Sequence, residues 1–428
     1  MKESSARVIA DLEELRRLTE NERGAQRVAW GPVWRTTREW FTKKVESEIG
    51  VTPHRDGAAN LWATLPGATT KSLVLGSHLD SVPGGGWLDG CLGVLAGLEA
   101  MRRAKAAGSL PVTLHLVDWA DEEGARFGRS LTGSAASAGA LDAHGELAHL
   151  TDRAGVKLPD ALAENGVSLD GMMTAAAYMK SLDPVAYLEL HIEQGPVMHE
   201  MKKSVAVVLG TMGVERANLR FKGQAAHSGA APIHLRKDAF LAAADFALAC
   251  RKISIKYSGK TPKTRVVATC GVVKVEPNFV TAVPGMTEIS IDLRALDAKT
   301  LRKMHADAKA AAKAAAKKFY CTVEWSSLLT ITPRLFDEGL MKTIRGAIKD
   351  VDTDKKPIAE IPSGPLHDAA EMVPVCPTAM VFAMSSPGVS HTKIEDTPRP
   401  ALDKSIRVFL LSVERTLAQL GASKVHRR

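Results

Sequence analysis

Three short apolar runs that end in, or lead directly into, imidazole and carboxylate side chains constrain the fold of this chain most. The runs Ser72–His78, Pro111–Trp119 and Ala186–Glu193 each have the length of one buried strand, and Gly90–Ala107 has the length of a helix. This β-α-β order predicts an α/β fold with a mixed, mostly parallel sheet flanked by helices. Ligands of open α/β sheets bind at the carboxyl ends of strands, which is where these polar side chains stand.

The pattern changes from about Gly213, where strand, helix, two strands, helix and strand follow one another. This order predicts a small four-stranded α+β domain. A buried strand at Ala379–Met384 then returns to the first pattern, so residues 212–327 are expected to be inserted into a main domain of residues 1–211 and 328–428. The expected elements of the insert are strands at Val214–Lys222, Arg265–Val275, Met286–Arg294 and Tyr320–Trp325, and helices at Asp238–Ile255 and Ala298–Lys318.

Size and charge narrow the class of protein. A chain of 428 residues with 45% apolar residues can fill two hydrophobic cores without disulfides. The formal net charge is +8, but Lys and Arg are spread along the chain, with no arginine-rich arm and no basic motif interleaved with aromatic residues. The densest run, residues 299–318, predicts an Ala/Lys helix with a solvated basic face. A nucleic-acid partner is therefore disfavoured.

The cysteines and the pattern of the N-terminal residues indicate the cellular compartment of the protein. The five cysteines are odd in number and form no CxxC pair, which is typical of free thiols in a reducing environment. Residues 1–20 have a charged amphipathic helix pattern without the apolar core of a signal peptide, and no apolar run is long enough to span a membrane. We therefore expect a cytoplasmic protein without a membrane partner.

Four clusters carry side chains suited to metal binding and hydrolysis. Each alone has an ordinary interpretation, since single histidines are mostly structural, paired glutamates mostly face solvent and glycine runs mostly mark turns. If the strands are parallel neighbours, however, all four clusters converge on one crevice. Imidazole with carboxylate ligands suits zinc, with manganese, cobalt or nickel as alternatives. The clusters are Gly76–Asp80 with Gly84–Gly90, Asp121–Gly124, His191–Gly195, and Ser390–His391 followed by Glu395.

These clusters resemble the motifs of the hydantoinase/carbamoylase amidase family, within the clan of two-metal aminoacylases and carboxypeptidases. The family includes N-carbamoyl-L-amino acid hydrolases, β-ureidopropionases and allantoate amidohydrolases. The resemblance covers residues 10–415. Its seven motifs stand in family order: GSHLDSVPGGGWLDGCLGVLAGLEA, DEEGARFGRSLTGSAASAG, LELHIEQGPV, GQAAHSGAAPIHLRKDA, VEPNFVTAVPG followed by DLR, SGPLHDAAEM, and GVSHTKIEDT.

The resemblance implies a centre with two divalent metal ions per subunit. His78, His191 and Asp89 would hold one ion. Asp89, Glu123 and His391 would hold the other, so that Asp89 bridges the two. Two ions that share a water molecule lower its pKa toward neutrality.

The resemblance also implies the roles of two further acidic residues. Glu122 would be the general base, because a carboxylate beside the attacking water can move its proton to the leaving nitrogen. Asp80 would accept the second ring N–H of His78. Adjacent glutamates in a loop can point to different sides, so Glu122 can stay free while Glu123 binds metal.

Substrate-binding roles follow from the same resemblance. His227, in the insert, would polarise the scissile carbonyl from the partner subunit of a homodimer built through the insert, which also acts as a lid. Asn278 and Arg294 would bind a substrate carboxylate, for which the planar fork of arginine is suited. Gln194 would contact the substrate or the catalytic water.

Several departures from the family motifs concern the substrate pocket and not the metal ligands. His367 lies in a family motif and is expected to shape the pocket, and Cys91 is expected to be a packed thiol rather than a nucleophile. The altered positions are Trp87-Leu88 before the bridging aspartate, Ala230-Ala231 before Pro232, Thr281 after Asn278, and Pro365-Leu366 before His367.

The sequence suggests four candidate functions. The first is hydrolysis of an N-carbamoyl amino acid or a similar ureido acid with a carboxylate. The second is hydrolysis of allantoate, an N-acyl amino acid or a dipeptide on the same metal site. A binding protein that lost catalysis would be expected to lack Glu122 or a metal ligand, and all are present. A basic nucleic-acid-associated protein is disfavoured by the charge distribution.

Overall fold

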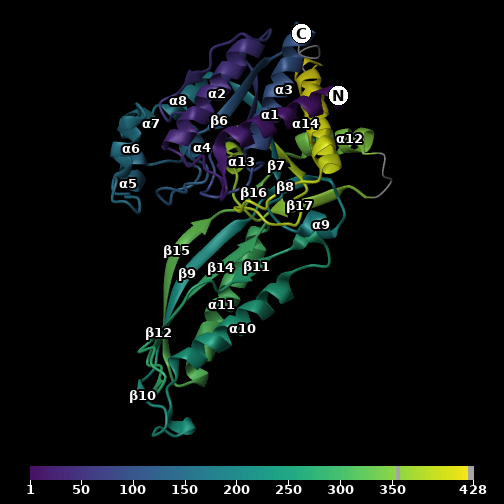
Figure 1. Ribbon diagram of the computed structural model, residues 1–428. Coiled ribbons are helices and arrows are strands. Elements are labelled where there is room, and N and C mark those ends of the chain that lie inside the picture. Colours follow the sequence, from purple (N-terminus) through teal and green to yellow (C-terminus); the bar gives the residue numbers. More distant parts are fainter. Residues whose placement is uncertain (353–356, 423–428) are drawn as a thin grey trace. The chain divides into compact units, whose positions relative to one another are not determined.

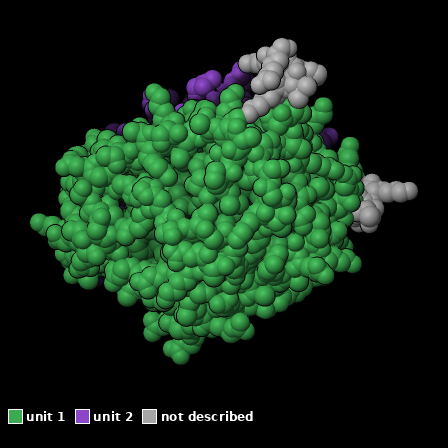
Figure 2. Space-filling model, turned by 90° about the horizontal axis from the view of Figure 1, so that it is seen from above, with its two compact units in different colours: residues 1–209, 336–361, 366–428 green, residues 210–335, 362–365 purple. Residues whose placement is uncertain are grey.

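The computed structural model describes residues 1–352 and 357–422 (Figure 1). The chain forms two compact units, shown in different colours in Figure 2. Unit 1 consists of Met1–Leu209, Phe336–Ile361 and Leu366–Arg428, and unit 2 of Gly210–Leu335 and Pro362–Pro365. Each unit has a hydrophobic core of its own. Within the described ranges, no helix is both long and apolar enough to cross a membrane.

The largest sheet has nine strands in the order β16-β8-β18-β7-β5-β6-β4-β3, with β17 beside β8. Its four central strands are parallel, since β5 pairs in parallel with β6 and β7, and β7 pairs in parallel with β18. The strands β4 and β8 join this centre in antiparallel orientation. The strands are β3 (His54–Arg55), β4 (Leu61–Leu65), β5 (Ser72–His78), β6 (Thr113–Trp119), β7 (Pro184–Ile192), β8 (Val205–Thr211), β16 (Arg334–Leu335), β17 (Ala359–Ser363) and β18 (Thr378–Ala383).

Helices cover this sheet as one packed group formed by α1, α3, α12 and α14, in which α3 contacts β5, β6 and β7 while α12 and α14 contact β18 (Figure 1). A second cluster packs α4 to α8 around Trp30 and Trp34. The helices of unit 1 are α1 (Lys2–Thr19), α2 (Pro32–Ile49), α3 (Cys91–Ala107), α4 (Thr132–Ser137), α5 (Ala143–Leu147), α6 (Leu158–Glu164), α7 (Leu169–Met172), α8 (Ala175–Ser181), α9 (Val197–Glu200), α12 (Glu338–Val351), α13 (Asp368–Met372) and α14 (Arg399–Ala422).

Unit 2 is an antiparallel sheet covered by two helices that contact each other and the strands β9 and β14 (Figure 1). Burial alternates residue by residue along β14, so that one face of the strand packs against the helices. The opposite face carries ion pairs such as Arg216–Asp292 and Arg220–Glu288. The elements are β9 (Gly213–Lys222), β11 (Val267–Thr269), β12 (Val273–Glu276), β14 (Met286–Ala295), β15 (Thr322–Ile331), α10 (Ala239–Tyr257) and α11 (Ala298–Lys318).

The predicted α/β fold with a separate antiparallel domain is confirmed, with one correction in unit 2. The single strand predicted at Arg265–Val275 is two strands, β11 and β12, so this sheet has five strands and not four. The pairing register with β14 slips by one residue between Thr269 and Val273. At this slip the hydroxyl of Ser290 accepts the backbone N–H of Val272, while the backbone N–H of Ser290 still donates to the Val272 carbonyl.

The remaining elements are short. Two ribbons are formed by β1 with β2 and by β10 with β13. They comprise β1 (Glu20–Asn21), β2 (Gly24–Ala25), β10 (Ala226–His227) and β13 (Ala282–Val283), and the 3-10 turns are Ile233–Leu235 and Pro262–Thr264.

Candidate functional site

The five predicted metal ligands all come from the carboxyl ends of the central strands or from loops beside them. His78 is the last residue of β5 and His191 the penultimate residue of β7. Glu123 follows β6, His391 follows β18, and Asp89 stands just before α3. Because these four strands are parallel neighbours, their carboxyl ends meet at one edge of the sheet. The structure therefore brings the five side chains together in unit 1.

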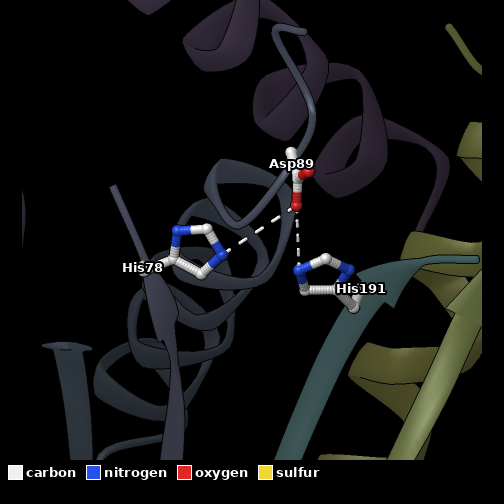
Figure 3. A group of neighbouring side chains, drawn as sticks. All are labelled: His78, Asp89 and His191. Carbon is white, nitrogen blue, oxygen red and sulfur yellow. Dashed lines mark ion pairs between the residues drawn. The ribbon is translucent and has the colours of Figure 1, made fainter. Parts of the chain in front are cut away.

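One group of possible ligands consists of His78, Asp89 and His191 (Figure 3). All three side chains are buried, and both imidazole rings turn a nitrogen toward the Asp89 carboxylate. The distance from Asp89 Oδ1 is 3.2 Å to His191 Nε2 and 3.9 Å to His78 Nε2. Among the described residues, neither Asp89 Oδ1 nor His191 Nε2 has a hydrogen-bond partner, although both atoms are buried. Buried polar atoms without a hydrogen bond are what a bound cation would satisfy.

A second group consists of Asp89, Glu123 and His391. His391 Nε2 lies 3.6 Å from Asp89 Oδ2 and 3.2 Å from Glu123 Oε2. Glu123 Oε1 is buried and has no hydrogen-bond partner in the described part of the chain, whereas half of the His391 side chain is exposed. Asp89 thus belongs to both groups and presents one carboxylate oxygen to each. The donor set of imidazoles and carboxylates fits divalent zinc, manganese, cobalt or nickel.

The turn before α3 brings Asp89 close to His78. Gly90 has a φ of 67°, and a Cβ atom at this position would lie 2.4 Å from the Cε1 atom of His78. Only glycine therefore allows the turn to approach the imidazole so closely. The neighbouring Cys91 is fully buried, and burial raises the pKa of its thiol, as expected for a packed side chain.

Asp80 lies behind His78 and also supports the loop of the two glutamates. His78 Nδ1 is 3.2 Å from the carbonyl oxygen of Asp80 and 3.4 Å from its Oδ1 atom. The carboxylate of Asp80 accepts the backbone N–H groups of Glu122 and Glu123. Glu122 Oε2 lies 3.6 Å from His78 Nε2, and Glu122 belongs to neither ligand group. The adjacent glutamates thus point to different partners.

The electrostatics of the site reflect crowded, buried charges. Burial raises the pKa of Glu122 well above its usual range, and the charge of Asp368 adds to this shift. Burial, followed by the charge of Asp89, does the same for Glu123. Burial also acts to raise the pKa of Asp89, but the imidazoles around it, His191 foremost, outweigh burial and hold that pKa below its usual range. A divalent cation would stabilise the ionised form of all these carboxylates.

Gln194, predicted to contact substrate, lies beside the second ligand group. Its amide Nε2 donates to Asp89 Oδ2 at 2.8 Å and is 3.4 Å from His391 Nε2. The hydroxyl of Ser385 accepts the backbone N–H of Gln194 and so holds this residue, whose φ is 61°. Its Oε1 atom is buried and finds no hydrogen-bond partner within residues 1–352 and 357–422.

The other three predicted substrate residues lie in unit 2. His227 is exposed, and its Nδ1 atom accepts the backbone N–H groups of Gly229 and Ala230, which leaves the ring proton on Nε2. Asn278 is exposed with a φ of 53°. The guanidinium of Arg294 donates twice to Asp292 and once to the Gly364 carbonyl. Of the five N–H donors of an arginine, two are not used by any described residue and remain for a ligand.

Glu189 was missed by the sequence analysis. Among the described residues it forms a third possible ligand group with His191 and His367. Its carboxylate, however, already accepts the hydroxyls of Ser77 and Tyr187 and a backbone N–H from α13, so its role is to join β5, β7 and α13. The alternation of side chains along β7 puts Glu189 on the same face as His191, a signal that the sequence did contain.

His367 packs its ring against His191, with the ring centroids 4.3 Å apart. Its side chain is buried, and burial lowers its pKa well below the usual range, so the ring is neutral. This residue borders the first ligand group in unit 1 and is therefore placed to shape the site.

Comparison with known proteins identifies the family of this chain. The model of peptidase family M20/M25/M40 matches residues 74–415, a segment that contains all five predicted ligands. The chain belongs to this family. The candidate site of the chain lies within the matched segment. The chain is a hydantoinase/carbamoylase-type amidase, which is an amidohydrolase of linear amides.

Several relatives cover nearly the whole chain. An N-carbamoyl-L-amino acid amidohydrolase of Geobacillus stearothermophilus is 34% identical over 353 residues, which is 81% of this chain and 83% of the relative. The allantoate amidohydrolase of Escherichia coli is 29% identical over 391 residues, or 91% and 92% of the two chains. The crystal structure of a hydantoinase/carbamoylase family amidase from Burkholderia multivorans superposes with a TM-score of 0.84 at 27% identity, covering 95% of this chain and 96% of the other.

Proposed function

We propose that this M20-family amidohydrolase hydrolyses an N-carbamoyl amino acid or a similar ureido acid at a centre of two divalent metal ions. The observation that carries the proposal is the position of Asp89, whose two carboxylate oxygens face two different ligand groups. His78 and His191 complete one group, and Glu123 and His391 complete the other. Zinc is the first candidate for both ions, with manganese, cobalt and nickel as alternatives.

The chemistry follows from the residues around the ligands. When bound, the ions supply Lewis acidity that lowers the pKa of the attacking water and polarises the amide carbonyl. Glu122 lies beside the ligands and outside both groups, so its carboxylate can take a proton from that water and deliver it to the leaving nitrogen. For an N-carbamoyl amino acid, water addition and C–N cleavage produce the amino acid, carbon dioxide and ammonia.

Unit 2 is proposed to bind the substrate. Because Nδ1 of His227 accepts two backbone N–H groups, Nε2 is left as the ring atom that can donate, and such a donor can polarise a carbonyl oxygen. The two remaining N–H groups of Arg294 and the exposed amide of Asn278 are suited to a substrate carboxylate. In unit 1, Gln194 donates to Asp89 and would contact the substrate or the catalytic water.

A homodimer built through unit 2 is part of the proposal. Leu241, Leu248 and Ile255 recur every seven residues on α10 and are 45%, 64% and 58% exposed. Three large apolar side chains on one face of a helix are typical of a protein interface. In such a dimer His227 of one protomer would serve the site of its partner.

The alternative is an allantoate-type, N-acyl amino acid or dipeptide amidohydrolase on the same metal site. It is supported by the relative from Escherichia coli and by the apolar side chains that replace common family residues near the site. Two of these, Trp87 and Leu88, directly precede Asp89 and are buried. The altered positions as a set are mostly apolar, which favours a substrate that is less polar than a simple ureido acid.

A substrate screen decides between these functions. The enzyme, stripped with a chelator and reconstituted separately with zinc, manganese, cobalt or nickel, is given N-carbamoyl amino acids, allantoate, N-acyl amino acids and dipeptides. Release of ammonia or amine is measured, and Asp89→Asn serves as the control that lacks the bridging carboxylate. We expect turnover of carbamoyl substrates only with metal. Turnover that survives complete metal removal would contradict the proposed centre, and exclusive turnover of an acyl substrate would favour the alternative.

A further inference from the structure

Glu395 is a buried carboxylate that connects the two loops carrying Asp89 and His391. Its side chain is almost wholly inaccessible, and its Oε1 atom accepts the backbone N–H of Asp89 at 3.1 Å. Its other oxygen, Oε2, accepts the hydroxyl of Ser390, the residue before His391. The Ser390 Oγ atom is also 2.8 Å from Asp89 Oδ2. The carboxylate of Glu395 therefore contacts the backbone N–H of Asp89 directly. It is also linked to the Asp89 side chain through the hydroxyl of Ser390.

Gly86 shows that this carboxylate is built into the loop. A Cβ atom at position 86 would lie only 2.1 Å from Glu395 Oε1 and 2.6 Å from the Cβ atom of Glu395. The backbone of Gly86 does not have a positive φ, so its conformation alone does not require glycine. The absence of a side chain is what lets Glu395 reach the Asp89 amide.

A further hydrogen bond joins the same two loops. The indole N–H of Trp87 donates to Asp396 Oδ1 at 3.2 Å. His391 itself has a φ of 59°, a left-handed conformation that is unfavourable for a residue with a side chain and must be held by its surroundings. Ser390 directly precedes His391. On the other side, the backbone N–H of Glu395 donates to the carbonyl of Thr392, the residue after His391. The loop of His391 is therefore held by the same residues that connect it to Asp89.

We propose that Glu395 is a positioning residue that orients Asp89 and His391 for metal binding. This inference rests on the proposed two-metal centre. Glu395 belongs to none of the ligand groups among the described residues, and both of its oxygens are engaged by Asp89 and Ser390. It therefore acts on the ions only through the ligands that it orients. Partners of this kind change metal affinity when they are removed.

The test measures zinc affinity by competition with a chromophoric chelator. For Glu395→Ala we expect the affinity for at least one of the two ions to fall about 10- to 100-fold. For Glu395→Gln we expect a smaller loss, because the amide oxygen still accepts the Asp89 N–H and the amide nitrogen can donate to Ser390 Oγ. The matched control is Glu99→Gln, a buried glutamate on α3 that pairs with Arg7 and Arg102. It should lower stability and leave zinc affinity unchanged.

Ser390→Ala gives a second measurement that does not risk the fold, since it deletes one hydroxyl group. We expect it to weaken zinc binding in the same direction as Glu395→Ala, and its effect decides the question if Glu395→Ala does not fold. Unchanged zinc affinity in Ser390→Ala and in folded Glu395→Ala would overturn this inference alone. A wild-type protein that binds no divalent ion would instead overturn the two-metal centre, and this inference with it.

Discussion

Both carboxylate oxygens of Asp80 accept backbone amides of the loop that carries Glu122, with 3.2 Å from Glu122 N to Oδ1 and 3.1 Å from Glu123 N to Oδ2. These bonds hold the backbone of two adjacent glutamates and leave their side chains free. Glu122 then reaches toward His78 and Glu123 toward His391. One loop can thus supply a metal ligand and a separate base.

We expect Glu122→Gln to keep its metal and its fold while turnover falls about 10²- to 10⁴-fold, because an amide cannot accept the proton of the attacking water. Steady-state turnover and metal content by elemental analysis are measured on the same preparation. Glu123→Gln is the matched control, and it should lose metal as well as turnover. Turnover near the wild-type value in metal-loaded Glu122→Gln would refute its role as base.

A mixed dimer tests whether His227 acts across the subunit interface. His227→Ala and Asp89→Asn should each be inactive, but refolding them together should restore about a quarter of wild-type activity, because half of the dimers then contain one intact site. The control mixes Asp89→Asn with His391→Ala. Both of these lesions lie in unit 1, so that mixture should stay inactive. Equal activity of the two mixtures, or a protein that remains monomeric at micromolar concentration, would count against the shared site.

Arg294→Ala tests the charge of the substrate. Losing one charge-assisted contact should lower kcat/KM for a carboxylate substrate about ten- to a hundred-fold, mainly through KM, and should leave the neutral amide analogue little affected. Arg216→Ala is the matched control, because Arg216 pairs with the same Asp292. If the two variants behave alike, the effect comes from releasing Asp292 and not from substrate binding. A wild-type preference for the neutral analogue would show that the site does not select an anion.

Burial lowers the pKa of His115, on β6, to about 4, well below the ordinary value of a histidine. Between pH 6.5 and 4 the unfolded chain therefore binds more protons at this residue than the folded protein does, so its contribution to stability is complete above pH 6.5 and is lost as the pH falls toward 4. We expect this residue to account for about 2 kcal/mol of the stability lost between pH 6.5 and 5.

Chemical denaturation at several pH values, in the presence of a chelator, measures this effect. His115→Asn keeps an acceptor toward the Thr64 hydroxyl, which contacts His115 Nδ1 at 2.9 Å, but cannot take up a proton. This variant should show a flatter dependence of stability on pH than the wild type, whereas the exposed His199→Gln should match the wild type. Identical slopes for wild type and His115→Asn would contradict the prediction.

The central strands and the helices around them were predictable from the sequence. Strand β5 coincides with the predicted Ser72–His78, and helix α3 (Cys91–Ala107) begins one residue after the predicted Gly90–Ala107, because apolar periodicity and composition are local properties. The prediction from the sequence was wrong where pairing with another strand interrupts a predicted strand. The single predicted strand is two strands, β11 and β12, because the register with β14 slips by one residue between them. This slip depends on the partner strand, which lies outside residues 265–275.

The sequence by itself determined which chemical groups end the central strands or follow them: histidines, aspartates and adjacent glutamates. Only the tertiary structure decided how these side chains are oriented toward one another. Asp89 presents one oxygen to each ligand group because Gly90 lets its turn approach His78 and because Glu395, more than three hundred residues further along the chain, accepts its backbone N–H. Such contacts depend on how distant loops pack together, and packing between distant segments leaves no periodic trace in the sequence.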